Sequence, residues 1–428
     1  MKIVLLVSSM HAGGAERVAA TLVNAWSARG DEVTLVPTFS SGGDCFYPIS
    51  DTVELIWLAD YAGTRNAGRF AAGHRLLALR RLIREKAPDV VVSFLTNVNV
   101  AAILATWGLK TPVIVCERTN PAVSRSASGV WRTLRRWLYP RADMVTVQAD
   151  ATVAPFSRLV PGIRRLAVIP NPLPQSLADR PPIDAASDLN AAQATSADLN
   201  TVPATSSDLD AVHATTSVLN TVPATSSARK RLMAMGRMVP DKQFDVLIDC
   251  FAALAPRHPD WDLWIWGEGP EREALADRVL QAGLLERIQL PGRTDMPWDE
   301  LACAQGFVLS SAVEGFPNVL LEAMALGLPC VAFDCPSGPR EMTRDGADGM
   351  LVPAGDAQAL QNAMQALMSD AGLRADLGAR AAQAVRRRYA LPAVLDAWDA
   401  LFAQVGATRH GADNNTSEHA VNARQGNT

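Results

Sequence analysis

Two glutamates with seven residues between them, Glu314 and Glu322, stand where an expected loop gives way to an expected helix. Pro317 suits the first helical position, and the N–H groups of Asn318 and Val319 would then be donors for a phosphate. Glu322 would lie further along, where its carboxylate could accept hydrogen bonds from vicinal hydroxyls such as those of a ribose. An acidic segment that complements the helix dipole is the alternative. It does not explain a carboxylate within an apolar segment, which needs a polar partner.

A basic loop follows an expected strand at residues 232–235. Arg237 can grip phosphate oxygens through two N–H groups, and Lys242 can place a point charge beside them. Two cations beside a diphosphate would stabilise it as a leaving group. The alternative is a pair of solvated surface cations, and this loop alone does not decide between the two interpretations.

A glycine pair, Gly13 and Gly14, follows the first expected strand at residues 3–7. Glycines there let the backbone approach a ligand, and the helix that follows would present unpaired N–H groups to a phosphate. A tight strand-to-helix turn is the alternative. The spacing is not GxGxxG, so nicotinamide and flavin binding lose support.

Short apolar runs alternate with helical patterns through most of the chain, which predicts parallel sheets covered by helices on both faces. The expected strands are residues 3–7, 32–37, 53–57, 90–94, 113–116 and 144–147, then 232–235, 263–266, 288–290, 307–309, 330–333 and 350–352. A last helical stretch, residues 373–404, has no strand after it. We therefore expect two α/β domains at 1–171 and 230–390, a linker at 172–229, a C-terminal helix at 391–406 and a disordered tail at 407–428.

The composition excludes several classes of protein. A formal net charge of −4 argues against a nucleic-acid binder that depends on overall basicity. The six cysteines form no CxxC pair and no zinc array, so we expect reduced core thiols. Residues 90–109 are too often interrupted by polar side chains to span a membrane, and the N-terminus is expected to be a strand rather than a signal peptide. Any membrane contact should be peripheral.

A ten-residue repeat, typified by residues 194–203, fills the segment from Asp184 to Ser227. Its period suits neither a helix nor a strand, and its apolar content is thin. We expect a disordered insertion there. A spacer or binding array is the alternative.

Taken together, these motifs resemble glycosyltransferase family 4, whose members are retaining enzymes of the GT-B fold. That fold consists of two Rossmann-like domains that face a central cleft. The resemblance runs from residue 1 to about residue 405, apart from the repeat. Three further segments support it: Gly267–Pro270, Pro291–Arg293 and Ala325–Pro329.

The resemblance implies a role for each donor-site residue. Arg237 and Lys242 would bind the donor diphosphate, Glu314 the hydroxyls of the transferred sugar, and Glu322 the ribose. The other donor-side residues it implies are Gly14, Arg293, Gly315, Phe316, Asn318 and Val319. The resemblance implies no metal and no cofactor besides the nucleotide sugar. This sequence departs from many members at Gln243, where they have Gly after the lysine, and at Pro317, where they also have Gly.

Other segments suggest the acceptor side. Glu117 and Arg118 lie in a segment that resembles bacterial transferases acting on polyprenyl-diphosphate-linked glycans, and His11 could touch the sugar or acceptor. Arginines and apolar residues share two stretches, 75–84 and 131–139, which would suit an anionic lipid surface. Ordinary amphipathic helices with snorkelling arginines are the alternative.

We therefore expect a metal-independent hexosyl- or N-acetylhexosaminyltransferase that moves a sugar from a nucleotide donor, UDP-linked, with retention. The expected acceptor is a glycan or polyprenyl-diphosphate-linked glycan in cell-surface polysaccharide or glycoconjugate synthesis. The expected location is the cytoplasm, at the inner face of the cytoplasmic membrane. Two alternatives are a GT-B-fold sugar-nucleotide epimerase and a non-catalytic sugar-binding partner. The donor sugar, the linkage and the oligomeric state stay open.

Overall fold

The computed structural model describes residues 1–40, 42–43, 45–64, 71–118, 129–183 and 229–409. The chain divides into two compact units, one formed by Met1–Pro172 with Leu391–Thr428 and the other by Leu173–Ala390. The ten-residue repeats and the chain beyond residue 409 lie outside the described residues.

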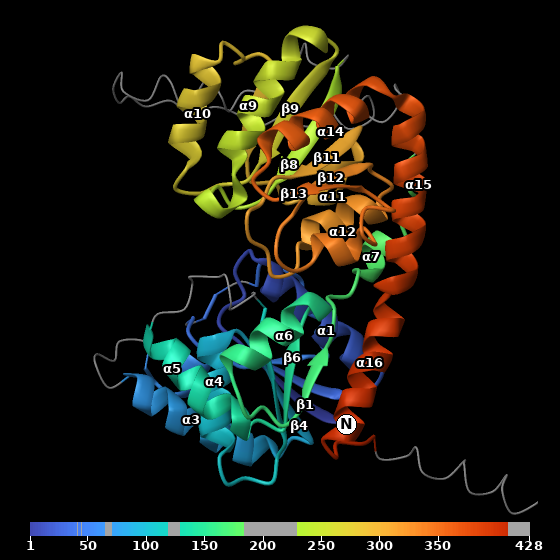
Figure 1. The fold of residues 1–428 in the computed structure, drawn as a ribbon. Helices are drawn as coiled ribbons and strands as arrows, with labels where there is room; N and C mark the ends of the chain where they lie inside the picture. Colours follow the sequence, from blue (N-terminus) through green and yellow to red (C-terminus); the bar gives the residue numbers. More distant parts are fainter. Residues whose placement is uncertain (41, 44, 65–70, 119–128, 184–228, 410–428) are drawn as a thin grey trace, which may run out of the picture. The chain divides into compact units, whose positions relative to one another are not determined.

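The first unit is built on a seven-stranded parallel sheet in the order β3-β2-β1-β4-β5-β6-β7. Three of its strands, β1, β4 and β6, are labelled in Figure 1. Its strands are β1 Lys2–Val7, β2 Glu32–Pro37, β3 Glu54–Leu55, β4 Val90–Phe94, β5 Val113–Cys116, β6 Met144–Val147 and β7 Leu166–Val168. Its helices are α1 Gly14–Ala28, α2 Leu58–Tyr61, α3 Ala71–Lys86, α4 Thr96–Thr106, α5 Gly129–Leu138, η1 Tyr139–Arg141, α6 Asp150–Leu159 and α16 Leu391–Gln404. The sequences of strands β1 and β4 are nearly unbroken apolar runs because both faces of the sheet are covered. The sequence did not predict β7, which is three residues long.

The last helix of the chain, α16, belongs to this first unit. Trp398 on α16 meets Trp26 on α1 edge to face, with ring centroids 5.6 Å apart, and α16 lies beside α1 in Figure 1. Asp399 also pairs with Arg29. The helical stretch expected at 373–404 is thus two helices, because Tyr389 and Ala390 separate α15 from α16 and Pro392 lacks the N–H to continue α15.

The second unit is built on a six-stranded parallel sheet in the order β10-β9-β8-β11-β12-β13. Its strands are β8 Lys230–Met235, β9 Trp261–Trp266, β10 Ile288–Gly292, β11 Gly306–Leu309, β12 Cys330–Asp334 and β13 Met350–Pro353. Its helices are α7 Gln175–Ala178, η2 Pro240–Lys242, α9 Phe244–Leu254, η3 Ala255–Arg257, α10 Arg272–Gln281, α11 Pro297–Ala302, α12 Asn318–Ala325, α13 Pro339–Met342, α14 Ala357–Ser369 and α15 Ala371–Arg388.

Residues 173–183, expected within the linker, are part of this second unit. Leu173 N–H donates to Tyr389 O, and Ile183 N–H donates to Leu326 O, both at 2.7 Å. The chain therefore packs on α12 and α15 up to the last residue described before the repeat.

Both sheets are doubly wound. In each, the first strand lies inside the sheet, the next two run out to one edge, and the chain then crosses to the other side. The prediction of two Rossmann-like domains is confirmed. Ligands of such sheets bind beyond the carboxyl ends of the strands, where the order reverses, here between β1 and β4 and between β8 and β11.

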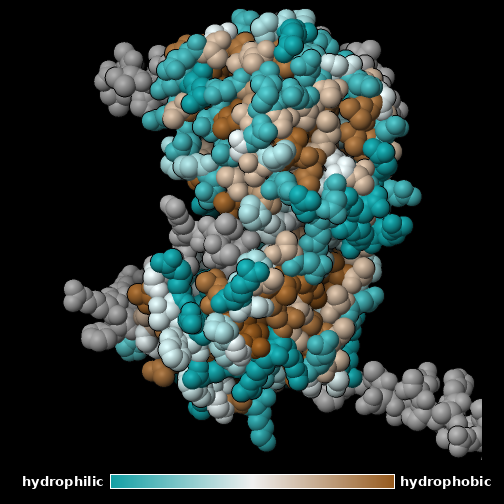
Figure 2. All heavy atoms as spheres, in the orientation of Figure 1, coloured by the Kyte–Doolittle hydropathy of each residue, from teal (hydrophilic) through white to brown (hydrophobic). Residues whose placement is uncertain are grey.

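None of the described helices combines the length and apolar character that a membrane span requires. Hydrophilic and hydrophobic residues are interspersed over the face drawn in Figure 2.

Candidate functional site

The predicted phosphate loop follows the carboxyl end of β8 and contains one residue, Gln243, with an unusual backbone conformation. The turn η2 ends at Lys242, and Gln243 then adopts a left-handed conformation with φ of 47° before α9 begins. Glycine reaches this region most easily, which accounts for the Gly that many family members carry after the lysine. Gln243 adopts it directly after Lys242, at some cost in backbone strain.

Two glycines of a neighbouring loop, after β9, fix the path of this phosphate loop. Met238 N–H donates to Glu268 O at 2.9 Å. A Cβ on Gly267 would lie 1.8 Å from Gly236 O, and one on Gly269 would lie 2.2 Å from Met238 O. Because no side chain fits either position, the Gly267–Gly269 spacing is explained by backbone contact with the phosphate loop.

Lys242 and Glu314, two of the predicted site residues, meet in this structure. Lys242 Nζ lies 2.5 Å from Glu314 Oε1, with the side chains 20% and 10% exposed. Hydrogen bonds to the backbone hold both segments in place, since Ala312 N–H donates to Asp241 O and the Ser337 side chain donates through Oγ to Glu314 O, each at 2.8 Å. The pair lies after β8 and β11, the adjacent strands at which the order of this sheet reverses.

Two predicted cations are exposed near the carboxyl ends of their strands. Arg237 follows β8, and Arg293 follows β10. Neither makes an ion pair with another described residue. Both guanidinium groups are therefore available to an anionic ligand, and their contact with a nucleotide stays a prediction.

The helix start expected around Pro317 is displaced by one residue. α12 begins at Asn318, and Pro317 is the residue before it. The first helical bonds are donated by Leu320 and Leu321 to Pro317 O. The N–H groups of Asn318 and Val319 precede those bonds in the chain, and their contact with a phosphate stays a prediction. Gly338 packs on this turn with φ of 107°, and a Cβ there would lie 2.5 Å from Pro317 Cδ.

Glu322 has the polar partner that its apolar surroundings require. The side chain is buried on α12, 2% exposed, and Trp298 Nε1–H donates to Glu322 Oε2 at 3.2 Å. Sequence reasoning missed Trp298, because a single tryptophan carries no signal of its partner. Phe316 is also buried and packs edge to face on Tyr389, so Gly315 and Phe316 can offer a ligand mainly their backbone.

The glycine pair of the first unit lies against a carboxylate. Gly13 precedes α1 and Gly14 begins it. Ser9 Oγ donates to Glu16 Oε1 at 3.1 Å, and Glu16 Oε2 lies 2.2 Å from where a Cβ on Gly13 would stand. An acidic side chain thus complements the start of α1 in this structure. His11 is exposed beside it.

Glu117 is buried in a polar cluster of the first unit. Its carboxylate accepts hydrogen bonds from Thr96 Oγ1 at 3.0 Å and from Tyr139 OH at 2.5 Å, and Arg135 Nη1 lies 3.8 Å away. Burial raises the pKa of Glu117. The side chain therefore ties β5 to α4 and η1, and its predicted contact with an acceptor stays untested.

Arg118 is also buried, at the carboxyl edge of the same sheet. Its guanidinium carbon lies 3.5 Å from the Phe94 ring centroid, and Nη1 donates to Asn171 Oδ1 at 2.6 Å. Burial lowers the pKa of Arg118 to about 10. The residues that follow in the predicted acceptor segment, 119–121, lie outside the described residues.

The two arginine-rich stretches divide into internal and surface residues. Arg80 donates to the carbonyls of Ala105 and Trp107, and Arg135 is buried beside Glu117. The exposed members, with their apolar neighbours, are Arg81, Arg84, Arg132, Arg136, Leu77 (68% exposed), Val130 (67%) and Trp137 (67%). We call this set the α3–α5 surface. Arg80 and Arg135 therefore contact the protein itself, and lipid contact by the exposed residues stays a prediction.

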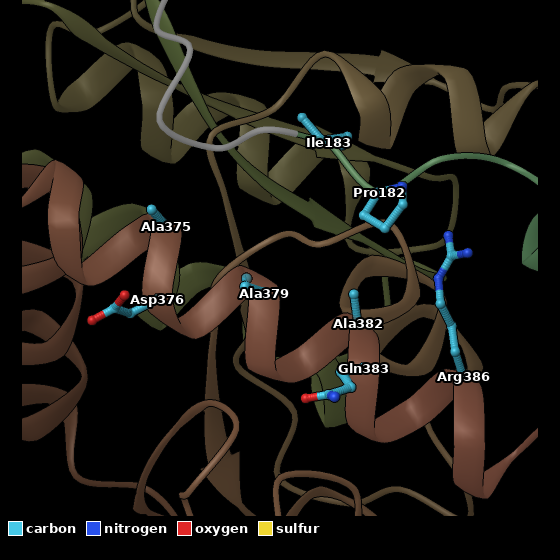
Figure 3. A pocket seen from close by; sticks show the side chains of 9 residues that line it. Pro182, Ile183, Ala375, Asp376, Ala379, Ala382, Gln383 and Arg386 are labelled. Carbon is cyan, nitrogen blue, oxygen red and sulfur yellow. The ribbon is translucent and has the colours of Figure 1, made fainter.

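No predicted site residue lines the pocket drawn in Figure 3. This pocket lies in the second unit between α15 and the segment Pro182–Ile183. Small side chains on α15 leave it open, with Arg386 at one end. Among the described residues, no group of three or more His, Cys, Asp or Glu side chains could hold a metal. All six cysteines are free thiols.

Solved structures share this fold along nearly the whole chain. A sucrose-phosphate synthase from Thermosynechococcus elongatus matches with a TM-score of 0.75 at 18% identity, over 95% of this chain and all of that one. The Anabaena protein HepE, solved with UDP and glucose, matches with a TM-score of 0.69 at 18% identity, over 94% and 99% of the two chains. The protein has the GT-B fold of these glycosyltransferases, as the resemblance implied.

The sequence matches agree with the fold. Residues 13–172 match a glycosyl transferase 4-like domain, and residues 229–370 match the family described as glycosyl transferases group 1. Together the two matches span well over half of the chain. The chain belongs to this family of glycosyltransferases.

Curated relatives include proteins of bacterial surface glycans. A Campylobacter jejuni α-1,4-N-acetyl-D-galactosaminyltransferase, named for a GalNAc-containing diNAcBac-PP-undecaprenol, is 25% identical over 407 residues, which are 95% of this chain and 99% of that protein. An exopolysaccharide phosphotransferase of Streptomyces coelicolor is 38% identical over 181 residues, 42% of this chain. The chain spans only 19% of that protein's length. A lipopolysaccharide core biosynthesis glycosyltransferase of Rhizobium meliloti is 34% identical over 172 residues, 40% of this chain and 49% of the relative.

Proposed function

We propose that this glycosyltransferase moves a sugar from a UDP-linked donor to a glycan or polyprenyl-diphosphate-linked acceptor, with retention at the anomeric carbon. The observation that carries the proposal is the meeting of Lys242 with Glu314, 72 residues apart, at the reversal of strand order in the second unit. A cation beside a carboxylate at that point suits a ligand that has both a diphosphate and sugar hydroxyls.

The proposed chemistry depends on charge at the diphosphate. As the bond from the anomeric carbon to the diphosphate oxygen breaks, negative charge grows on the leaving group, and Arg237 and Lys242 would stabilise it. The acceptor hydroxyl would attack on the same face, and a diphosphate oxygen would take its proton. We assign no protein nucleophile. The two cations and the start of α12 would supply the positive charge, so the proposal includes no metal.

The acceptor class is proposed from the relatives. The Campylobacter relative, whose name states an undecaprenyl-diphosphate-linked glycan, aligns over nearly its whole length. Other relatives are named for lipopolysaccharide core and amylovoran biosynthesis. These names support a role in making a cell-surface polysaccharide or lipid-linked glycan.

Peripheral contact with the inner face of the cytoplasmic membrane is part of the proposal. The α3–α5 surface combines exposed arginines with exposed apolar side chains, Trp137 among them. Such a surface suits the headgroup region of an anionic bilayer, where a lipid-linked acceptor would be found.

A transfer assay tests the proposed function. Thermal-shift screening over UDP-, GDP- and ADP-sugars first identifies the donor, since a ligand that binds the folded state raises the melting temperature. The donor is then incubated with and without short polyprenyl-diphosphate glycans, and products are separated by anomeric configuration. We expect an α-linked product from an α-linked donor. Epimerised donor without acceptor, or binding with no transfer to any acceptor, would contradict the proposal.

A further inference from the structure

The indole of Trp298 is placed against the carboxylate that we assign to the ribose. Trp298 lies on α11, which packs on α12, and its N–H donates to Glu322 Oε2 at 3.2 Å. Glu322 itself is buried among apolar residues of α12. A hydrogen bond to a carboxylate in such surroundings is stronger and more directional than one at the surface.

The Trp298 ring is also contacted by the segment that precedes the repeat. The Arg180 guanidinium lies 5.7 Å from the ring centroid and pairs with Asp299 at 2.5 Å. Arg386 on α15 donates to the carbonyls of Ala178 at 2.8 Å and Arg180 at 2.5 Å. These contacts restrict the ring, so the direction of its N–H is set by the fold.

Other tryptophans of this unit show that packing does not require such a bond. The indole nitrogens of Trp261, Trp264 and Trp266 are buried without a hydrogen-bond partner among the described residues. The fold thus tolerates buried indole N–H groups that have no acceptor. Trp298 differs from these three in donating to a carboxylate, and that carboxylate belongs to the predicted donor site.

We propose that Trp298 is a positioning residue of the donor site, whose N–H orients the Glu322 carboxylate to accept hydrogen bonds from the ribose hydroxyls of the nucleotide. This inference rests on the proposed function of Glu322. A carboxylate offers about four acceptor positions, so a bond from Trp298 leaves capacity for two hydroxyls. Orienting it before the ligand arrives removes a rotational freedom that would otherwise be lost on binding.

The test compares two tryptophans and two ligands. Trp298→Phe removes the N–H that bonds Glu322, and Trp264→Phe removes a buried N–H that bonds nothing described. Calorimetry with UDP and with 2′,3′-dideoxy-UDP measures the dependence on the ribose hydroxyls. We expect Trp298→Phe to weaken UDP binding about tenfold, the usual effect of losing a hydrogen bond to a charged group. For dideoxy-UDP the expected loss is under about twofold, and Trp264→Phe should leave the ratio of the two affinities unchanged.

Kinetics and a second variant complete the experiment. Trp298→Phe should raise the donor KM and change kcat little, because ribose contacts alter little as the sugar departs. If Trp298→Phe does not fold, Arg180→Met removes the guanidinium contact with the ring, and its smaller loss should again depend on the ribose hydroxyls. Equal weakening for both ligands, or none, overturns the positioning role. Glu322→Gln binding UDP normally, or no nucleotide binding by the unaltered protein, overturns the donor site itself.

Discussion

Replacing Glu314 by Gln removes the negative charge that faces Lys242 while keeping the size of the side chain. The two groups are 2.5 Å apart, so a diphosphate that binds the Lys242 ammonium group must compete with Glu314 for it. We therefore expect Glu314→Gln to bind free UDP more tightly than the unaltered protein. The same variant should transfer sugar more slowly, because the sugar hydroxyls lose an acceptor.

The size of the effect follows from the distance and the exposure of the pair. At an effective dielectric constant of about 20, two unit charges 2.5 Å apart attract by roughly 7 kcal/mol. The side chains are 20% and 10% exposed, so solvation of the separated charges offsets most of that attraction. A net value of about 1–2 kcal/mol, between those of surface and buried pairs, corresponds to UDP binding that is roughly 5- to 30-fold tighter.

Calorimetry with UDP at low and high salt measures this change, with transfer kinetics on the same samples. Asp241→Asn is the matched control, because it also removes one negative charge near Lys242, from η2 itself, at a side chain that is exposed and makes no described ion pair. The reasoning is refuted if Glu314→Gln binds UDP no more tightly than the unaltered protein. It also fails if Asp241→Asn tightens binding as much, since net charge rather than the ion pair would then explain the change.

Three further expectations concern other parts of the chain. Arg237→Ala and Lys242→Ala should each lower kcat by about 10²–10³ and raise the donor KM, because their contacts strengthen as charge grows on the diphosphate; near-normal turnover in both folded variants would place the active site elsewhere. Replacing Asp184–Ser227 by a short flexible linker should leave UDP binding, measured by calorimetry, unchanged. A variant that folds but no longer binds UDP would contradict a spacer role. Vesicles that contain anionic lipid should bind the protein at low salt and release it at high salt in flotation, with each arginine contributing about 1 kcal/mol; Arg132→Gln with Arg136→Gln should weaken binding, and indifference to salt would rule out an electrostatic contact.

Much of the fold was predictable because burial leaves a local trace in the sequence. Strands covered on both faces are continuous apolar runs. In the helices between them, apolar residues recur every three to four positions. The core strands such as β1, β4 and β8 were therefore placed correctly. The three-residue β7, whose side chains are only partly buried, was missed.

Candidate donor-site residues came from types and spacing within short segments and from the family resemblance, and their roles stay predictions. A carboxylate in the apolar sequence of α12 predicted that Glu322 needs a partner, and the partner exists. The sequence could not say that this partner is Trp298. It also could not say that Lys242 meets Glu314, because that contact depends on β8 and β11 being neighbours in the sheet.

Only the tertiary structure separated the arginines and glutamates that look alike in sequence. Arg135 and Glu117 are buried together, whereas Arg132 and Arg136, on the same helix as Arg135, are exposed. It likewise assigned α16 to the first unit through the contact of Trp398 with Trp26. The local sequence pattern indicates whether a side chain is exposed to water or buried. Which distant group it meets there is decided by the packing of elements far apart in the chain, and that packing leaves no mark in any one segment.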